Sequence, residues 1–176
     1  MLYCGADAML VREDLLTVDP LEFRSIIGHF ATGVTVITTA AGDQLHGMTA
    51  NAVSSLSLDP VLVLICVDKT THTHRVLAEG GVFTVNILGE HQEALSRIFA
   101  KKSEPEIDTL RGQSFRMGES GAPILADCLA FIECRVETVL DGGDHSIFLG
   151  RVVSEGVESE MRPLLFYRGG YHTLGV

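Results

Sequence analysis

The fold is decided by residues 129–153, which read LAFIECRVETVLDGGDHSIFLGRVV. In the first half, apolar residues such as Ile132 and Cys134 alternate with charged residues such as Glu133. This period of two predicts a strand with its apolar face in a core and its charged face in solvent. The DGGD sequence at 141–144 predicts a tight turn, after which the chain returns as a second strand. The stretch therefore predicts a long antiparallel hairpin.

Further strands are predicted on both sides of the hairpin. They are rich in β-branched and apolar residues and are bounded by Gly, Pro or Asp. They cover residues 34–39, 44–47, 61–68, 82–88, 163–167 and 171–174. Two short helices are predicted at 71–79 and 92–100, and residues 101–121 are polar and irregular. Because most strands follow one another directly, we expect a mainly β fold, a closed or nearly closed antiparallel barrel.

A third helix is predicted near the N-terminus. Asp19 is a suitable N-cap, Pro20 fits the first helical position, and Glu22 follows three residues after the cap. An apolar stripe at helical spacing predicts that this helix packs on the core. The stripe consists of Phe23, Ile26, Ile27 and Phe30. Residues 1–18 are expected to be a flexible arm, and residues 19–176 a single domain.

Composition limits the class of protein. The chain has 176 residues, of which 46% are hydrophobic and 20% charged, so it can form one well-packed domain. Its formal net charge of −10 argues against a nucleic-acid partner, which requires a basic face. The longest apolar run, 61–67, is too short to cross a bilayer. We expect a soluble cytoplasmic protein without a membrane association.

The four cysteines, Cys4, Cys66, Cys128 and Cys134, form no C-x-x-C pair. Two of them lie in strand-like apolar runs, so we expect free thiols in a reducing compartment. No pattern of His and Cys ligands indicates a metal.

Three segments could carry chemistry. Residues 48–57 bring uncharged hydroxyl and amide side chains into an apolar region, which suits a planar, phosphate-bearing cofactor but is also typical of a solvated loop. His145 follows the Gly-Gly-Asp turn and could orient a ligand or titrate near neutral pH, although turn histidines are often only solvent-exposed. Within 66–74, Cys66 is expected to be a small buried side chain, and His72 and His74 polar surface.

Six motifs occur in a recognisable order. They are FATGVTV at 30–36, GMTANAVSSLSLDP at 47–60, FTVNIL at 83–88, FA at 99–100, GDH at 143–145 and PLLFY at 163–167. From about residue 20 to the C-terminus, the chain closely resembles the flavin reductase family, the small reductases of two-component flavin monooxygenases. One departure is Ala52, where the family often has Ser.

The resemblance implies an FMN-binding split β-barrel of Greek-key-like antiparallel strands, usually a homodimer. Such enzymes transfer a hydride from NAD(P)H to FMN or FAD, and the reduced flavin diffuses to a separate oxygenase. Because the cofactors carry the chemistry, the protein needs only to stack the rings and supply donors at the flavin edge.

The resemblance also implies the flavin-binding residues. Those along the flavin would be Thr32, Gly33, Val34, Thr35 and Val36. Those facing the ring, ribityl chain and phosphate would be Thr49, Ala50, Asn51, Ser54 and Ser55. Those bordering the ring through their backbone would be Cys66, Val67, Asp68 and Lys69. Those closing over the phosphate end would be Phe99, Ala100 and Lys101, with Lys102 as a neighbour.

The nicotinamide would dock against Gly143, Asp144, His145 and Tyr171, with His145 as an orienting group and proton source. NADH is favoured over NADPH, because Arg135 and Arg151 are the only basic residues near the turn and form no tight cluster. Two alternatives keep a flavin: a reductase of a ferric chelate or corrin cobalt, and a non-catalytic electron carrier.

Overall fold

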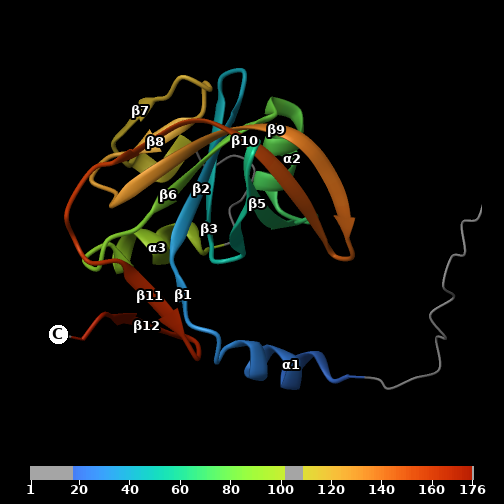
Figure 1. Ribbon diagram of the computed structural model, residues 1–176, viewed down its shortest axis with the longest axis vertical. Coiled ribbons are helices and arrows are strands. Elements are labelled where there is room, and N and C mark those ends of the chain that lie inside the picture. Colours follow the sequence, from blue (N-terminus) through green and yellow to red (C-terminus); the bar gives the residue numbers. More distant parts are fainter. Residues whose placement is uncertain (1–17, 102–108, 176) are drawn as a thin grey trace, which may run out of the picture.

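The computed structural model describes residues 18–101 and 109–175. The expected N-terminal arm, except Val18, and Lys102 lie outside these ranges. The described chain is mainly β, as predicted, with three short α-helices (Figure 1). The helices are α1 (Pro20–Ile27), α2 (His72–Gly80) and α3 (Glu93–Phe99), with a 3₁₀ turn at Thr109–Gly112. The strands are β1 (Thr32–Gly33), β2 (Thr35–Ala41), β3 (Gln44–Ala50), β4 (Val53–Leu58), β5 (Val61–Asp68), β6 (Val82–Ile87), β7 (Phe115–Met117), β8 (Pro123–Leu125), β9 (Ala130–Gly142), β10 (His145–Val157), β11 (Leu164–Tyr167) and β12 (Gly170–Thr173).

The main sheet has seven antiparallel strands in the order β3-β2-β6-β9-β10-β5-β4. Its two edge strands, β3 and β4, are consecutive in the chain and are joined by residues 51–52 alone. A two-residue link holds the two ends close together, so the sheet must curl until its edges approach each other. This arrangement confirms the predicted antiparallel barrel, which is left open along one side.

The hairpin that decided the fold is longer than expected. β9 and β10 each contain 13 residues and pair from His145↔Gly142 to Val157↔Ala130, with two bulges. β5, the strand predicted at 61–68, lies between β10 and the edge strand β4.

Two small sheets flank the main one. β1 pairs with β11, and β11 with β12, which attaches the C-terminal hairpin to the chain entering β2. β7 and β8 form the third sheet.

Two apolar clusters occupy the two faces of β2. Ile37 lies in the first, inside the curl, together with Ile65, Phe83 and Phe148. Val36 points to the opposite face, where α3 and the C-terminal hairpin cover the second cluster. The helix predicted at 92–100 is confirmed, with Phe99 buried in that cluster.

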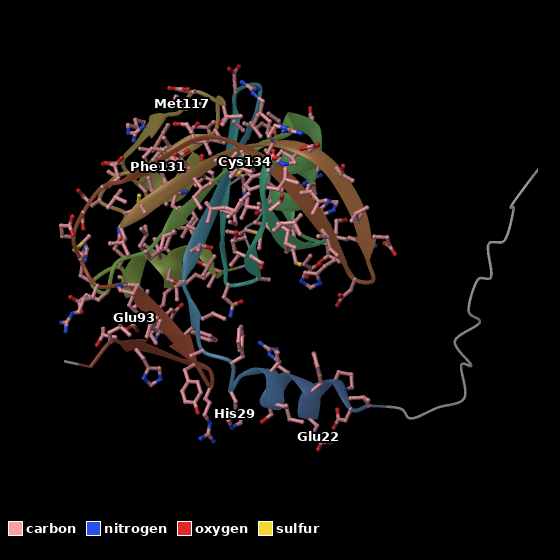
Figure 2. The ribbon with its side chains drawn as sticks, viewed as in Figure 1. Glu22, His29, Glu93, Met117, Phe131 and Cys134 are labelled. Atoms are coloured by element: carbon pink, nitrogen blue, oxygen red, sulfur yellow. The ribbon has the colours of Figure 1, made fainter. Side chains whose placement is uncertain are left out.

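α1 departs from its prediction. Asp19 does cap the helix, accepting a hydrogen bond from the Leu21 N–H at 2.9 Å. The helix ends at Ile27, and none of its residues is buried. The apolar stripe that was expected to pack on the core is exposed to solvent, with Phe23 56% and Ile26 62% exposed. Figure 2 shows Glu22 and His29 in a segment that projects from the main body. The periodicity identified an amphipathic helix, but this chain's own core does not cover it.

Glu133 corrects another expectation. It was assigned to the solvent face of its strand, but it is 1% exposed. Its carboxylate accepts hydrogen bonds from the Ser120 N–H at 3.0 Å, the Ser120 hydroxyl at 2.8 Å and the Glu119 N–H at 3.2 Å. The segment carrying β7 and β8 folds over this face of the sheet, and the carboxylate binds its backbone donors.

The described cysteines are free, as predicted. Burial raises the pKa of the Cys128 thiol to about 11 and that of Cys134 to about 12, so neither is a thiolate near neutral pH. Within residues 18–101 and 109–175, no helix is long and apolar enough to span a membrane.

Candidate functional site

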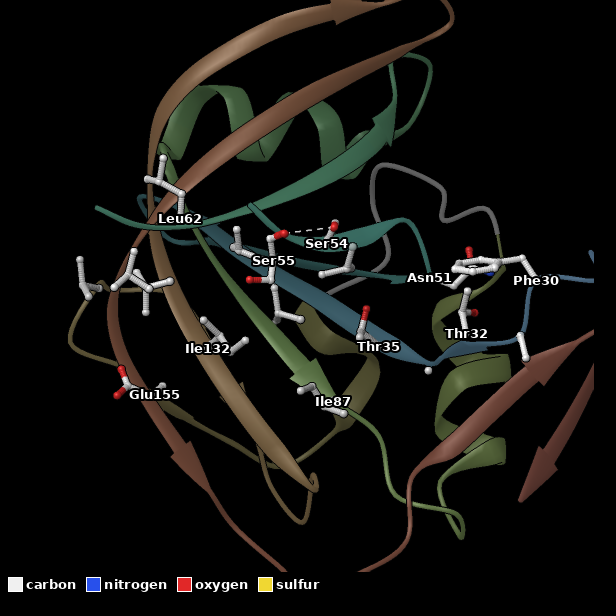
Figure 3. Close-up of a pocket in the computed structure, with 18 residues that line it drawn as sticks. Phe30, Thr32, Thr35, Asn51, Ser54, Ser55, Leu62, Ile87, Ile132 and Glu155 are labelled. Atoms are coloured by element: carbon white, nitrogen blue, oxygen red, sulfur yellow. Dashed lines mark hydrogen bonds between the residues drawn. The ribbon is translucent and has the colours of Figure 1, made fainter. Parts of the chain in front are cut away.

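A pocket of about 760 Å³ lies in the open side of the curled sheet. Its walls come from strands on both sides of the opening, and Figure 3 shows Ser54 and Asn51 on one wall and Ile87 and Thr35 on another. The lining is Phe30, Ala31, Thr32, Gly33, Thr35, Asn51, Val53, Ser54, Ser55, Val61, Leu62, Val63, Val85, Ile87, Ile132, Val152, Val153 and Glu155. Most of these side chains are aliphatic, and the hydroxyl and amide groups come from Thr32, Thr35, Asn51, Ser54 and Ser55.

Six of the predicted flavin residues line this large pocket. They are Thr32, Gly33, Thr35, Asn51, Ser54 and Ser55. The Thr35 hydroxyl is already used, since it donates to the carbonyl of Ala50 at 2.6 Å. The Thr32 hydroxyl oxygen is buried and has no hydrogen-bond partner among the described residues. A buried hydroxyl without a partner is costly, so a donor or acceptor from a ligand or water would complete it.

A second pocket, of about 190 Å³, is lined by four other predicted flavin residues: Thr49, Phe99, Ala100 and Lys101. The rest of the lining is Thr70, Thr71, His72 and Thr73 with His46, Gly47 and Met48. None of these was among the predicted flavin residues, although 70–73 lie within the candidate segment 66–74. The run of hydroxyls at 70–73 was the signal that could have found them. His46 and Thr73 are joined by a 2.8 Å hydrogen bond. Burial and the nearby Arg75 guanidinium lower the pKa of His72, so this part of the lining favours a neutral imidazole.

Gly47 shapes the small pocket. A Cβ at this position would lie 2.8 Å from Cε1 of the Phe99 ring, closer than real contacts allow. The ring therefore occupies the space that a side chain at Gly47 would need.

Several predicted residues turn their side chains into the core. Val34, Val36, Ala50 and Val67 are all less than 10% exposed and belong to the two apolar clusters. A ligand could meet them only through their backbone. For Val34 the backbone is also occupied, because its N–H donates to Leu164 O and its carbonyl accepts from Leu88 N–H.

The predicted nicotinamide turn lies against the end of β5. His145 pairs with Asp68 across the two strands, and the Lys69 N–H donates to the carbonyl of Asp144 at 3.1 Å. Nδ1 of His145 donates to the Asp144 carboxylate at 2.8 Å. Cys66 lies two residues before Asp68, half-buried on the same strand. The structure therefore places 66–69 and 143–145 side by side, and none of these residues lines either of the two pockets.

Tyr171 lies elsewhere. Its hydroxyl shares a 2.7 Å hydrogen bond with Ser96 of α3, and the Arg97 guanidinium lies 4.8 Å from its ring centroid. The Ser96 carbonyl accepts a hydrogen bond from the Thr49 hydroxyl at 2.6 Å. Figure 1 shows β12 and the tip of the β9–β10 hairpin on opposite sides of the molecule. Within one chain, Tyr171 thus supports α3 and Thr49, away from His145.

This arrangement suits a flat, partly polar molecule. The large pocket offers aliphatic walls with a few uncharged donors and acceptors, which is how proteins hold planar cofactors. In the described parts of the chain, no three His, Cys, Asp or Glu side chains gather as a metal site. The orphaned Thr32 hydroxyl fits a ligand that carries its own hydrogen-bonding groups.

Comparison with known proteins decides the family. The profile of the flavin reductase like domain matches residues 27–175. The chain belongs to this family. It is 43% identical over 156 residues to the reductase subunit of a flavin-dependent monooxygenase from Mycobacterium tuberculosis, covering 88% of this chain and 82% of that one. It is 40% identical over 155 residues to an NADH-dependent FAD reductase from Streptomyces globisporus, covering 87% and 85%.

Solved structures agree. The Streptomyces globisporus NADH:FAD oxidoreductase, crystallised with NAD and FAD fragments, superposes with a TM-score of 0.81 at 39% identity. The match covers 92% of this chain and 98% of that one. The predicted family and fold are confirmed, and this flavin reductase is an oxidoreductase.

Proposed function

We propose that this flavin reductase transfers a hydride from NADH to FAD or FMN, and that the reduced flavin is delivered to a separate monooxygenase. The relatives support each part: one is named for its NADH dependence and FAD, and another as the reductase subunit of a monooxygenase. The observation that carries the site assignment is the gathering of six predicted flavin residues on one pocket.

The end of the large pocket lined by Thr32, Asn51 and Ser54 would hold the flavin, because Ala52 is hydrogen-bonded to Cys66 near the His145 end of β5. The flavin supplies the hydride-accepting ring when bound. The protein's part is to bind and orient it, with aliphatic walls against the ring and the Thr32 hydroxyl and Asn51 side chain as hydrogen-bonding groups. The small pocket, bearing the Lys101 ammonium and the hydroxyls of 70–73, would take the phosphate end. Since the net charge of −10 opposes anionic ligands at long range, binding depends on such local donors.

His145 would orient the nicotinamide. Because a carboxylate can only accept, the bond to Asp144 fixes the proton on Nδ1. Nε2 of the neutral ring is then an acceptor, which suits the amide N–H of a carboxamide. The same bond holds the ring direction, so His145 needs no further proton transfer to do this work.

NADH remains the proposed hydride donor, because the described basic residues do not form a free cluster at the turn. Arg151 is six residues along β10 from His145, about 20 Å at strand rise, and pairs with Arg135 across the strands. Neither arginine lies at the turn. The lysine that does, Lys69, is already paired with Asp141, so no free basic cluster awaits a 2′-phosphate among the described residues there.

We also propose a homodimer in which α1 packs on a second copy. An isolated helix of eight residues is marginal in water and needs packing to persist. The apolar side chains of α1 are more than half exposed: Leu21 at 76%, Phe23 at 56%, Ile26 at 62% and Ile27 at 51%. Phe30, also 72% exposed, connects this helix to the pocket wall. Sedimentation should give a dimer, and Ile26→Glu should shift it toward monomer.

The deciding experiment is stopped-flow oxidation of NADH and NADPH with FAD and FMN supplied separately. We expect NADH oxidation to depend on the flavin that is added. NADH should be a better donor than NADPH. A protein purified with tightly bound flavin that reduces a ferric chelate faster than free flavin would overturn the proposal. Coupling to a purified flavin-dependent monooxygenase tests delivery of the product.

A further inference from the structure

The turn that carries His145 is held by one lysine. Lys69 Nζ pairs with the Asp141 carboxylate and donates to the Gly143 carbonyl at 2.6 Å. The Lys69 backbone N–H donates to the Asp144 carbonyl at 3.1 Å. Three bonds from one residue thus reach both ends of segment 141–144, which comprises the last two residues of β9 and the two-residue turn before β10.

These bonds lead directly to His145. The turn ends at Asp144, whose carboxylate accepts from His145 Nδ1 at 2.8 Å. Gly143 has a φ of +81°, a left-handed conformation that glycine adopts freely, so the turn has little stiffness of its own. A charge-assisted bond to its carbonyl is an effective restraint on such a residue.

We propose that Lys69 is a positioning residue for nicotinamide use: its pair with Asp141 fixes segment 141–144 and thereby the direction of the His145 ring. The inference rests on the proposed role of His145. It differs from the expectation that Lys69 borders the flavin. The ammonium is turned to the hairpin, and neither pocket includes Lys69 in its lining.

The pair has little to do with overall stability. The Lys69 side chain is 38% and the Asp141 side chain 81% exposed, and exposed ion pairs contribute about 0–1 kcal/mol. The Lys69 ammonium lowers the pKa of Asp141, so the pair stays charged throughout the neutral range. A loss of activity without a loss of stability would therefore point to positioning.

The test compares Lys69→Met and Asp141→Asn with matched controls on the same hairpin. Arg151 and Glu137 form a 2.8 Å pair across the same two strands, away from the turn. Arg151→Met and Glu137→Gln therefore remove the same charges without touching it. We expect Lys69→Met and Asp141→Asn each to raise the KM for NADH about 3- to 10-fold, the range of one charge-assisted surface contact. The flavin Kd of these variants should stay within about twofold of the original value. Lys69→Arg should return the KM for NADH most of the way to the original value. The double variant should have a KM for NADH no higher than that of either single variant.

The sign of the Asp141→Asn effect separates positioning from direct binding. If Lys69 binds a phosphate, removing its carboxylate partner frees the ammonium, and the KM for NADH or the flavin Kd falls. That outcome, or effects equal to those of the two controls, overturns the inference. His145→Ala is measured in parallel. If it leaves the KM for NADH unchanged, the proposed role of His145 fails; if it raises the KM while Lys69→Met does not, only the positioning role fails.

Discussion

The unpartnered hydroxyl of Thr32 allows a prediction in which stability and binding change in opposite directions. Thr32→Val keeps the shape of the side chain and removes an oxygen that is buried without a partner. An unsatisfied buried polar group costs about 1–3 kcal/mol, so the ligand-free variant should be more stable. At about 2–4 °C per kcal/mol for a domain of this size, its Tm should rise by several degrees.

Flavin binding should weaken in the same variant. If the hydroxyl bonds to bound flavin, its loss removes one neutral hydrogen bond, about 0.5–1.5 kcal/mol. The Kd for flavin should then rise about 2- to 10-fold. Quenching of flavin fluorescence on titration measures the Kd, and thermal unfolding without flavin measures the Tm.

Thr84→Val is the matched control. Its hydroxyl is the other buried side-chain oxygen without a partner among the described residues, and Thr84 lines neither pocket. This variant should gain stability and leave the flavin Kd unchanged. If Thr32→Val also leaves the Kd unchanged while raising the Tm, the missing partner of Thr32 is not the flavin, and the placement of the flavin in the large pocket is refuted.

Three further variants test other parts of the structure. Glu133→Gln should lower the free energy of unfolding by about 2–4 kcal/mol in denaturant titrations, because an amide N–H₂ replaces an acceptor for buried donors. A change below about 0.5 kcal/mol would contradict a stabilising role for the hydrogen bonds that the Glu133 carboxylate accepts from residues 119 and 120. Gly47→Ala should weaken flavin binding several-fold by displacing the Phe99 ring from the small pocket, and a crystal structure with that ring unmoved would count against this. His145→Ala should reduce kcat/KM for NADH and leave the flavin Kd near its original value; equal loss of both would contradict an orienting role.

Local signals predicted the elements well. Three predicted features depend on residues near one another in sequence, and each is present. They are the Asp19 cap, the helix that Gly81 caps and the long hairpin. Gly81, for example, has the left-handed φ of 66° that commonly ends a helix. The antiparallel barrel could be predicted because most strands follow one another in the chain with short connections.

Burial was harder to predict, since it depends on segments distant in sequence. Alternation placed Glu133 in solvent, but the β7–β8 segment covers it and supplies three donors. Periodicity placed Phe23 and Ile26 in a core, yet no described part of the chain covers them. A pattern shows which face is apolar, but not what packs against it.

The candidate site was predicted mainly through the resemblance. It named 66–69 for the flavin and 143–145 for the nicotinamide, and the two segments are neighbours because they end paired strands. It did not separate Tyr171 from His145 within one chain, and none of its six motifs includes the hydroxyls at 70–73. Single-residue roles such as that of Lys69 depend on side-chain direction, which no sequence pattern contains.

The link of two residues between the edge strands has a consequence for how a ligand comes and goes. β3 and β4 are neighbours in the chain but have no ladder of hydrogen bonds between them in the described sheet. Asn51 of the link and three residues of β4 line the large pocket, so the pocket borders this seam between β3 and β4. Widening the seam requires only a slight change in the curl of the sheet, and no strand pair has to break. Under the proposed function, a flavin would then enter oxidised and leave reduced without any local unfolding.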